Sequence, residues 1–166
     1  MQIVTPDFKG ENKGHYSAGV ISNGTLYVSG QLSIDPDTRE VCKGDIREHT
    51  RLALNNVKRV LDAAGVTTND VVFCRIYTPD VNYWGPINEE YAAFFGEHKP
   101  GRVIVSTTTL HFGCLVEIES HRFRKKGSLR ILQSAAFCLT VAKNRLISFD
   151  ADGQSQRDKR RWLPKR

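Results

Sequence analysis

A single apolar stripe along residues 45–64 constrains the fold of this chain more than any other feature. The apolar residues recur at intervals of three and four, the spacing of a helix with one buried face: Ile46, Ala53, Leu54, Val57, Val60, Leu61 and Ala64. Asp45 suits the N-terminal end, and Gly65 can end the helix in the left-handed conformation. A helix with one apolar face must pack against another layer, so the flanking sequence has to supply one.

The segment before this helix predicts a β-hairpin. Residues 16–22 and 25–29 are β-prone and flank Asn23-Gly24, a dipeptide suited to the two positive-φ positions of a type I′ turn. Gly30 ends the second strand, and residues 31–34 can continue it beyond a bulge.

The segment after the helix predicts three strands and a second helix. The strands are expected at residues 71–77, 102–108 and 114–123, and the helix runs from Gly85 or Pro86 to residue 95. In the last strand Val116 and Ile118 alternate with Glu117 and Glu119, which gives one apolar and one acidic face.

This order of elements predicts a mixed sheet with both helices on one face, because strand–helix–strand crossovers are right-handed. The opposite face of the sheet has no helix to cover it. If that face is apolar, another copy of the chain must bury it, so an oligomer is expected.

The net positive charge of the chain comes entirely from its C-terminal part. Residues 1–126 contain 15 Lys and Arg against 15 Asp and Glu, whereas residues 127–166 contain 9 against 3. The neutral body argues against nucleic acid as a partner, since phosphate binding needs a basic face. We expect residues 127–166 to form a basic extension that is partly disordered or poorly packed.

The sequence also predicts a cytoplasmic protein without a metal site. No apolar run is long enough to span a membrane, and residues 1–14 lack the pattern of a secretory signal. The four cysteines form no CxxC pair, and the five histidines show neither HxH nor HExxH spacing.

Arg102 and Glu117 are the charged residues of most interest, because both lie on predicted strands among apolar residues. One interpretation is a preorganised site for an anionic ligand. The alternatives are a structural ion pair or two solvated strand ends, and Glu119 competes with Glu117 because both face the same way.

Several motifs together resemble the RidA (YjgF) family of reactive-intermediate deaminases. They are HYSAGVISNGTLYVSGQLSIDP, NNVKRVLDAAG, NEEYAAFF, PGR and VEIE, in the order and spacing of that family. The resemblance implies a RidA-like domain at residues 1–126 with a chorismate-mutase-like α+β fold. It also implies a homotrimer with a central β-barrel and ligand clefts between subunits.

The resemblance further implies a cofactor-independent hydrolysis of 2-imino or enamine acids, such as 2-aminoacrylate, to 2-keto acids and ammonia. Arg102 matches the arginine that binds the substrate carboxylate, and Glu117 matches the glutamate that activates water. Tyr16, Ser29, Gly30 and Asn88 match residues that line the substrate pocket. Ile104 also lies at a pocket position, where relatives often have cysteine, and it takes part through its backbone. A non-catalytic trimer that binds keto acids and an endoribonuclease or translation inhibitor are the alternative functions.

Overall fold

The computed structural model describes residues 1–11 and 14–123 of the 166-residue chain. Helix α1 spans Ile46–Ala63 and α2 spans Trp84–Phe95. The strands are β1 (Gln2–Val4), β2 (Gly19–Ser22), β3 (Thr25–Leu32), β4 (Phe73–Thr78), β5 (Gly101–Ser106) and β6 (Glu117–Phe123). The basic extension expected at residues 127–166 lies outside the described residues.

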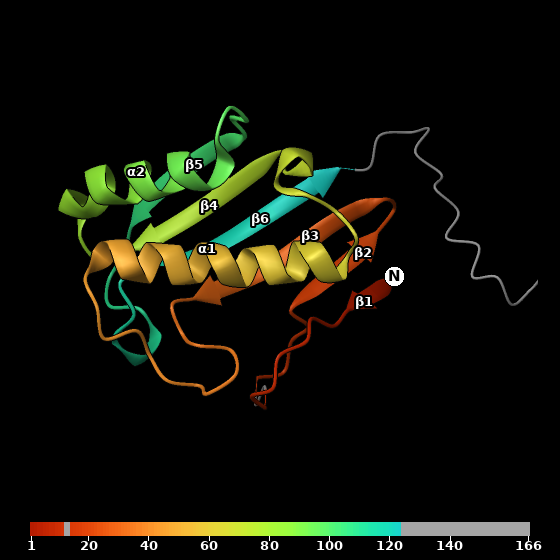
Figure 1. The fold of residues 1–166 in the computed structure, drawn as a ribbon, viewed down its shortest axis with the longest axis horizontal. Helices are drawn as coiled ribbons and strands as arrows, with labels where there is room; N and C mark the ends of the chain where they lie inside the picture. The colour runs from red at the N-terminus through yellow and green to blue at the C-terminus, as the bar shows by residue number, and fades with distance from the viewer. Residues whose placement is uncertain (12–13, 124–166) are drawn as a thin grey trace, which may run out of the picture. The chain divides into compact units, whose positions relative to one another are not determined.

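The strands of this described part form one mixed sheet in the order β1-β2-β3-β6-β4-β5. Strands β4 and β5 pair in parallel, and the other neighbours are antiparallel. Both helices lie on the same face of the sheet (Figure 1). This arrangement confirms the predicted α+β fold class. Strand β6 lies between β3 and β4 and is antiparallel to both.

Helix α1 begins and packs as its sequence predicts. The Asp45 carboxylate accepts hydrogen bonds from the backbone N–H groups of Arg47 and Glu48, and the Glu48 carboxylate accepts one from the N–H of Asp45. Gly65 follows the helix with a φ of 68°. The apolar stripe is buried in the core between α1 and the sheet: Ala53, Leu54, Val57, Val60 and Leu61.

The predicted hairpin is β2 and β3, whose turn has positive φ at Asn23 and Gly24. The register between β3 and β6 shifts between Val28 and Gln31, which confirms the expected bulge near Gly30. The bulge turns Gln31 toward the helices, where its side chain is buried.

Two predicted strands begin three residues later than expected, at Gly19 and Glu117. Before Gly19, the carbonyls of Ser17 and Ala18 accept bonds from Ser29, beside the bulge. Before Glu117, the backbone of Leu115 bonds to side chains, namely His49 and Thr78, instead of to a neighbouring strand. These bonds join residues that are distant in the sequence, so residue periodicity does not reveal them.

The face of the sheet opposite the helices carries exposed apolar side chains, including Tyr27, Val103 and Val105. This is the uncovered face that the order of elements predicts. Within residues 1–11 and 14–123, no helix is long and apolar enough to cross a membrane.

Candidate active site

Arg102 lies on β5, the edge strand, and its side chain points to the helix-covered face. Its Nη1 donates a hydrogen bond of 2.9 Å to the Oδ1 atom of Asn88 on α2. The guanidinium carbon lies 4.8 Å from the centroid of the Tyr91 ring and 5.7 Å from that of Trp84. Among the described residues, no carboxylate forms a salt bridge with Arg102. Its charge is therefore oriented by an amide and aromatic rings and remains available to an anion.

The thiol of Cys74, beside Arg102, is not an activated nucleophile. Cys74 pairs with Arg102 across β4 and β5 and is buried. Burial raises the pKa of the Cys74 thiol to about 11, although a bond to Tyr91 and the charge of Arg102 act in the opposite direction. The thiol stays protonated at neutral pH, so Cys74 is not suited to covalent chemistry.

Glu117 lies on the opposite face of the sheet and lines a second pocket. The other lining residues are Gly30, Tyr77, Thr107, Thr109, Leu110, His111 and Glu119. The Glu117 carboxylate forms no hydrogen bond or salt bridge with another described residue. Burial raises the pKa of this carboxyl above its ordinary value, while His111 lowers it and Glu119 raises it further. A partly buried, unpaired carboxylate with a raised pKa has the properties of a general base.

Glu119, the competing acid, is already engaged. Its Oε1 lies 2.6 Å from Nη1 of Arg75, directly across on β4, and it accepts a 3.4 Å bond from the hydroxyl of Tyr77. Arg75 neutralises this carboxylate. Glu117 is consequently the acid of the pair that can accept a proton from a ligand or a water molecule.

Gly30 and Ser29 shape the pocket around Glu117. A Cβ atom on Gly30 would overlap Oε1 of Glu117, so only glycine allows the carboxylate to lie against the β3 backbone. The Ser29 hydroxyl donates a 2.7 Å bond to the Ser17 carbonyl and holds the segment that carries Tyr16. Ser29 thus acts on the shape of the pocket, and its hydroxyl donates to a backbone carbonyl and not to a basic side chain.

Replacement of Gly30 by alanine is expected to displace the Glu117 carboxylate. A catalytic group misplaced by about 1 Å can cost about 100-fold in rate. For a reaction that uses Glu117 as its base, we therefore expect kcat to fall by about tenfold or more. Gly85→Ala is the matched control, since a Cβ at that helical position meets no atom within 4 Å. The control should keep its activity and gain slightly in Tm. Equal activity of the two variants would show that the reaction does not need the close approach of the Glu117 carboxylate to the Gly30 backbone.

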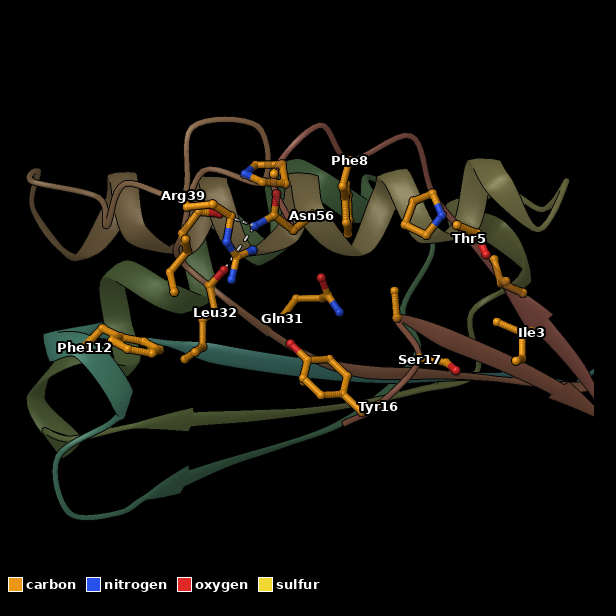
Figure 2. Close-up of a pocket in the computed structure, with 17 residues that line it drawn as sticks. Ile3, Thr5, Phe8, Tyr16, Ser17, Gln31, Leu32, Arg39, Asn56 and Phe112 are labelled. Atoms are coloured by element: carbon orange, nitrogen blue, oxygen red, sulfur yellow. Dashed lines mark hydrogen bonds between the residues drawn. The ribbon is translucent and has the colours of Figure 1, made fainter. Parts of the chain in front are cut away.

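A further cavity of about 400 Å³ lies between the N-terminal segment, the end of β3 and α1. Tyr16, Gly30 and Phe112 are among its lining residues, and Tyr16 and Phe112 are both largely exposed. Figure 2 shows the amide of Gln31 inside this cavity, between the rings of Phe8 and Tyr16. Gly30 lines both this cavity and the Glu117 pocket, whereas Tyr16 lines the cavity and not the Glu117 pocket.

The predicted site residues fall into two groups that a single chain does not bring together. Arg102, Asn88 and Ile104 lie at β5 and α2, whereas Glu117, Gly30, Ser29 and Tyr16 lie near the bulge of β3. Arg102 is paired with Cys74 and Glu117 with Tyr77, which face opposite sides of β4. The structure therefore excludes an ion pair between Arg102 and Glu117 within one chain. We call these groups the arginine half-site and the glutamate half-site.

The sequence analysis missed His111 and Tyr77 in the glutamate half-site. Tyr77 could have been found from the sequence, because it alternates with the buried residues of its strand. In the structure it pairs with Glu117. His111 has none, since it lies in a short irregular segment whose next residue, Phe112, has a φ of 61°. Among the described residues, no three His, Cys, Asp or Glu side chains are arranged to hold a metal ion.

Comparison with known proteins places this geometry in a family. Residues 9–121 match the endoribonuclease L-PSP family. A RutC family protein of Pyrococcus horikoshii is 42% identical over 112 residues, which cover 68% of this chain and 89% of the relative. The 2-iminobutanoate/2-iminopropanoate deaminase of Rattus norvegicus is 35% identical over 107 residues, covering 64% of this chain and 78% of the relative.

A solved structure shares the fold over the same region. The Escherichia coli protein TdcF, crystallised with bound serine, superimposes with a TM-score of 0.70 at 31% sequence identity. The match covers 75% of this chain and 100% of TdcF. The motifs, the fold and these relatives lead to one conclusion: the chain belongs to the endoribonuclease L-PSP family, to which the RidA deaminases belong.

Proposed function

We propose that this protein hydrolyses reactive 2-imino and enamine acids, such as 2-aminoacrylate, to 2-keto acids and ammonia. The observation that carries the proposal is the contrast between two neighbouring acids. Glu119 is neutralised by Arg75, whereas Glu117 forms no hydrogen bond or salt bridge with another described residue and its pKa is raised. The deaminase name of the rat relative and the serine bound to TdcF support an amino-acid-derived substrate.

In the proposed reaction Arg102 binds the substrate carboxylate through two parallel N–H bonds. Asn88 keeps the guanidinium plane in place. Glu117 accepts a proton from water as the water oxygen attacks the C=N carbon of the protonated imine, which yields a neutral carbinolamine. Glu117 then returns this proton to the carbinolamine nitrogen. The C–N bond breaks to release ammonia, while the carbinolamine hydroxyl gives its proton back to the Glu117 carboxylate and the C=O bond of the keto acid forms. Positioning and general-base assistance are the main contributions, and the base alone is worth about 10²–10⁴-fold.

We further propose that the reacting site forms between copies of the chain. The arginine and glutamate half-sites lie on opposite faces of one sheet, so a ligand that contacts both needs two chains. The exposed apolar face with Tyr27, Val103 and Val105 offers a surface on which copies can associate. A homotrimer with a central β-barrel, as the family resemblance implies, satisfies both requirements. The backbone of Ile104, on edge strand β5, would then border the cleft.

Two other functions remain as alternatives with their own observations. Endoribonuclease activity is suggested by the family description, but residues 1–126 carry as many acidic as basic side chains. Binding of a metabolite without turnover is suggested by TdcF with serine, and it would need Arg102 but not Glu117.

The test couples the purified protein to a serine dehydratase and follows the release of keto acid. The wild-type protein should accelerate release beyond spontaneous hydrolysis, and Arg102→Ala should lower kcat/KM by about 100-fold or more, because bonds to a charged group are lost. Arg51→Ala is the matched control, as Arg51 is an exposed arginine on α1 that pairs with Glu90. Equal rates with and without the wild-type protein would refute the proposal. Keto-acid binding without turnover would favour the binding function, and RNA cleavage without deamination the nuclease.

A further inference from the structure

The buried imidazole of His49 joins the two chain segments that flank the glutamate half-site. His49 lies on α1 with 3% of its surface exposed, and Ser33, which follows β3, is fully buried beside it. The Ser33 Oγ atom lies 2.5 Å from Nδ1 of His49, and the Leu115 N–H donates a 3.3 Å bond to the same nitrogen. Ser33 is three residues after Gly30, and Leu115 is two residues before Glu117.

We call the contacts of His49 with Ser33 and Leu115 the junction. These contacts define the protonation state of the His49 imidazole. A backbone N–H can only donate, so Nδ1 of His49 must accept, and the proton of the neutral ring then lies on Nε2. The Ser33 hydroxyl can therefore also donate to Nδ1. Burial lowers the pKa of His49, and Asp45 and Glu48 on the same helix raise it. Since burial is the largest of these effects, the neutral acceptor form is favoured.

The surrounding bonds make this junction rigid. Nδ2 of Asn56, two turns further along α1, donates to the carbonyls of Leu32 and Ile34, on either side of Ser33. The Leu115 carbonyl accepts a 3.1 Å bond from the hydroxyl of Thr78 on β4. The peptide groups of Leu115 are thus held at the N–H by α1 and at the carbonyl by β4.

We propose that His49 is a positioning residue for Glu117, acting through the Leu115 N–H. Leu32 is paired with Glu117 in the β3–β6 ladder, so the segments bonded to His49 enter that ladder side by side. By bonding both segments, the imidazole sets where β6 begins and how the Glu117 carboxylate lies against Gly30. The inference rests on the proposed role of Glu117 as the base, but the junction itself can be measured without the reaction.

The test compares variants that separate the acceptor from the ring. His49→Asn keeps an acceptor near the position of Nδ1, whereas His49→Leu fills the volume without one. His49→Leu should lower kcat by about tenfold to 100-fold with little change in KM, because the carboxylate anchor is untouched. His49→Asn should stay within about threefold of the wild type. Thr50→Val is the matched control: it removes the side-chain hydrogen bond of a buried residue within α1, from the Thr50 hydroxyl to the Ile46 carbonyl, and should leave kcat unchanged.

Amide hydrogen exchange gives a readout that does not depend on activity. The Leu115 amide should lose protection at least about tenfold in His49→Leu and keep it in Thr50→Val. On acidification the wild-type amide should lose protection as Nδ1 becomes a donor, and His49→Asn should not, which tests the junction even if His49→Leu fails to fold. Unchanged Leu115 protection in His49→Leu, or an acid response that His49→Asn retains, would overturn the inference. If the wild type shows no deamination while these exchange results hold, the proposed reaction fails and the junction stands.

Discussion

Replacement of Glu117 by glutamine is expected to lower kcat for imine hydrolysis by about 10²–10⁴-fold and to raise Tm at pH 7. The rate falls because glutamine cannot accept the proton of the attacking water. Stability rises because the wild-type protein holds a partly buried carboxylate with no hydrogen bond or salt bridge to another described residue. If Glu117 served the fold instead, its replacement would change kcat and Tm in the same direction.

The pH dependence gives the sign of this effect. Folding raises the pKa of Glu117, so the folded protein binds more protons than the unfolded chain between the ordinary glutamate pKa and the raised value. Stability therefore falls as the pH rises through this window, and the loss is complete above it. The Tm difference between Glu117→Gln and the wild type should vanish below the ordinary glutamate pKa of about 4.3. Thermal unfolding measured across this range checks the prediction.

Glu119→Gln is the matched control, because it lies two residues away on the same face. It loses the contacts with Arg75 and Tyr77, so its Tm should not rise. Its kcat should fall far less than that of Glu117→Gln. If Glu119→Gln were the more damaging variant, the assignment of the base would be wrong.

The fold was predictable where neighbours along the chain determine the structure. The capping of α1 by Asp45 and the turn at Asn23-Gly24 depend on residues within four positions of each other. The uncovered face of the sheet followed from the order of strands and helices. These features need no knowledge of distant contacts, and the structure confirms them.

The candidate site was less predictable because its properties depend on distant partners. Glu117 and Glu119 are equivalent in the sequence, and Arg75, 44 residues before Glu119, distinguishes them. The role of His49 depends on a contact with Leu115, 66 residues away. Separation of Arg102 from Glu117 follows from pairing registers, which strand periodicity alone does not give.

Mixing two inactive variants is expected to restore activity if the half-sites join between copies. Arg102→Ala has an intact glutamate half-site, and Glu117→Gln has an intact arginine half-site. In a randomly mixed ring from equal amounts of each, about a quarter of the interfaces combine the two intact halves. Activity should then recover to about a quarter of the wild-type value, measured as keto-acid release after the variants are denatured together and refolded.

The control for this recovery mixes Arg102→Ala with the double variant Arg102→Ala/Glu117→Gln, which contributes no intact arginine half-site. The subunits of this mixture exchange as freely as those of the first, but the mixture should stay inactive. A site contained within one chain would give no recovery in either mixture, since each chain would carry its own defect. Recovery in the first mixture alone would therefore establish that Arg102 and Glu117 act on one substrate from different copies. This would explain why Arg102 and Glu117 lie on opposite faces of one sheet.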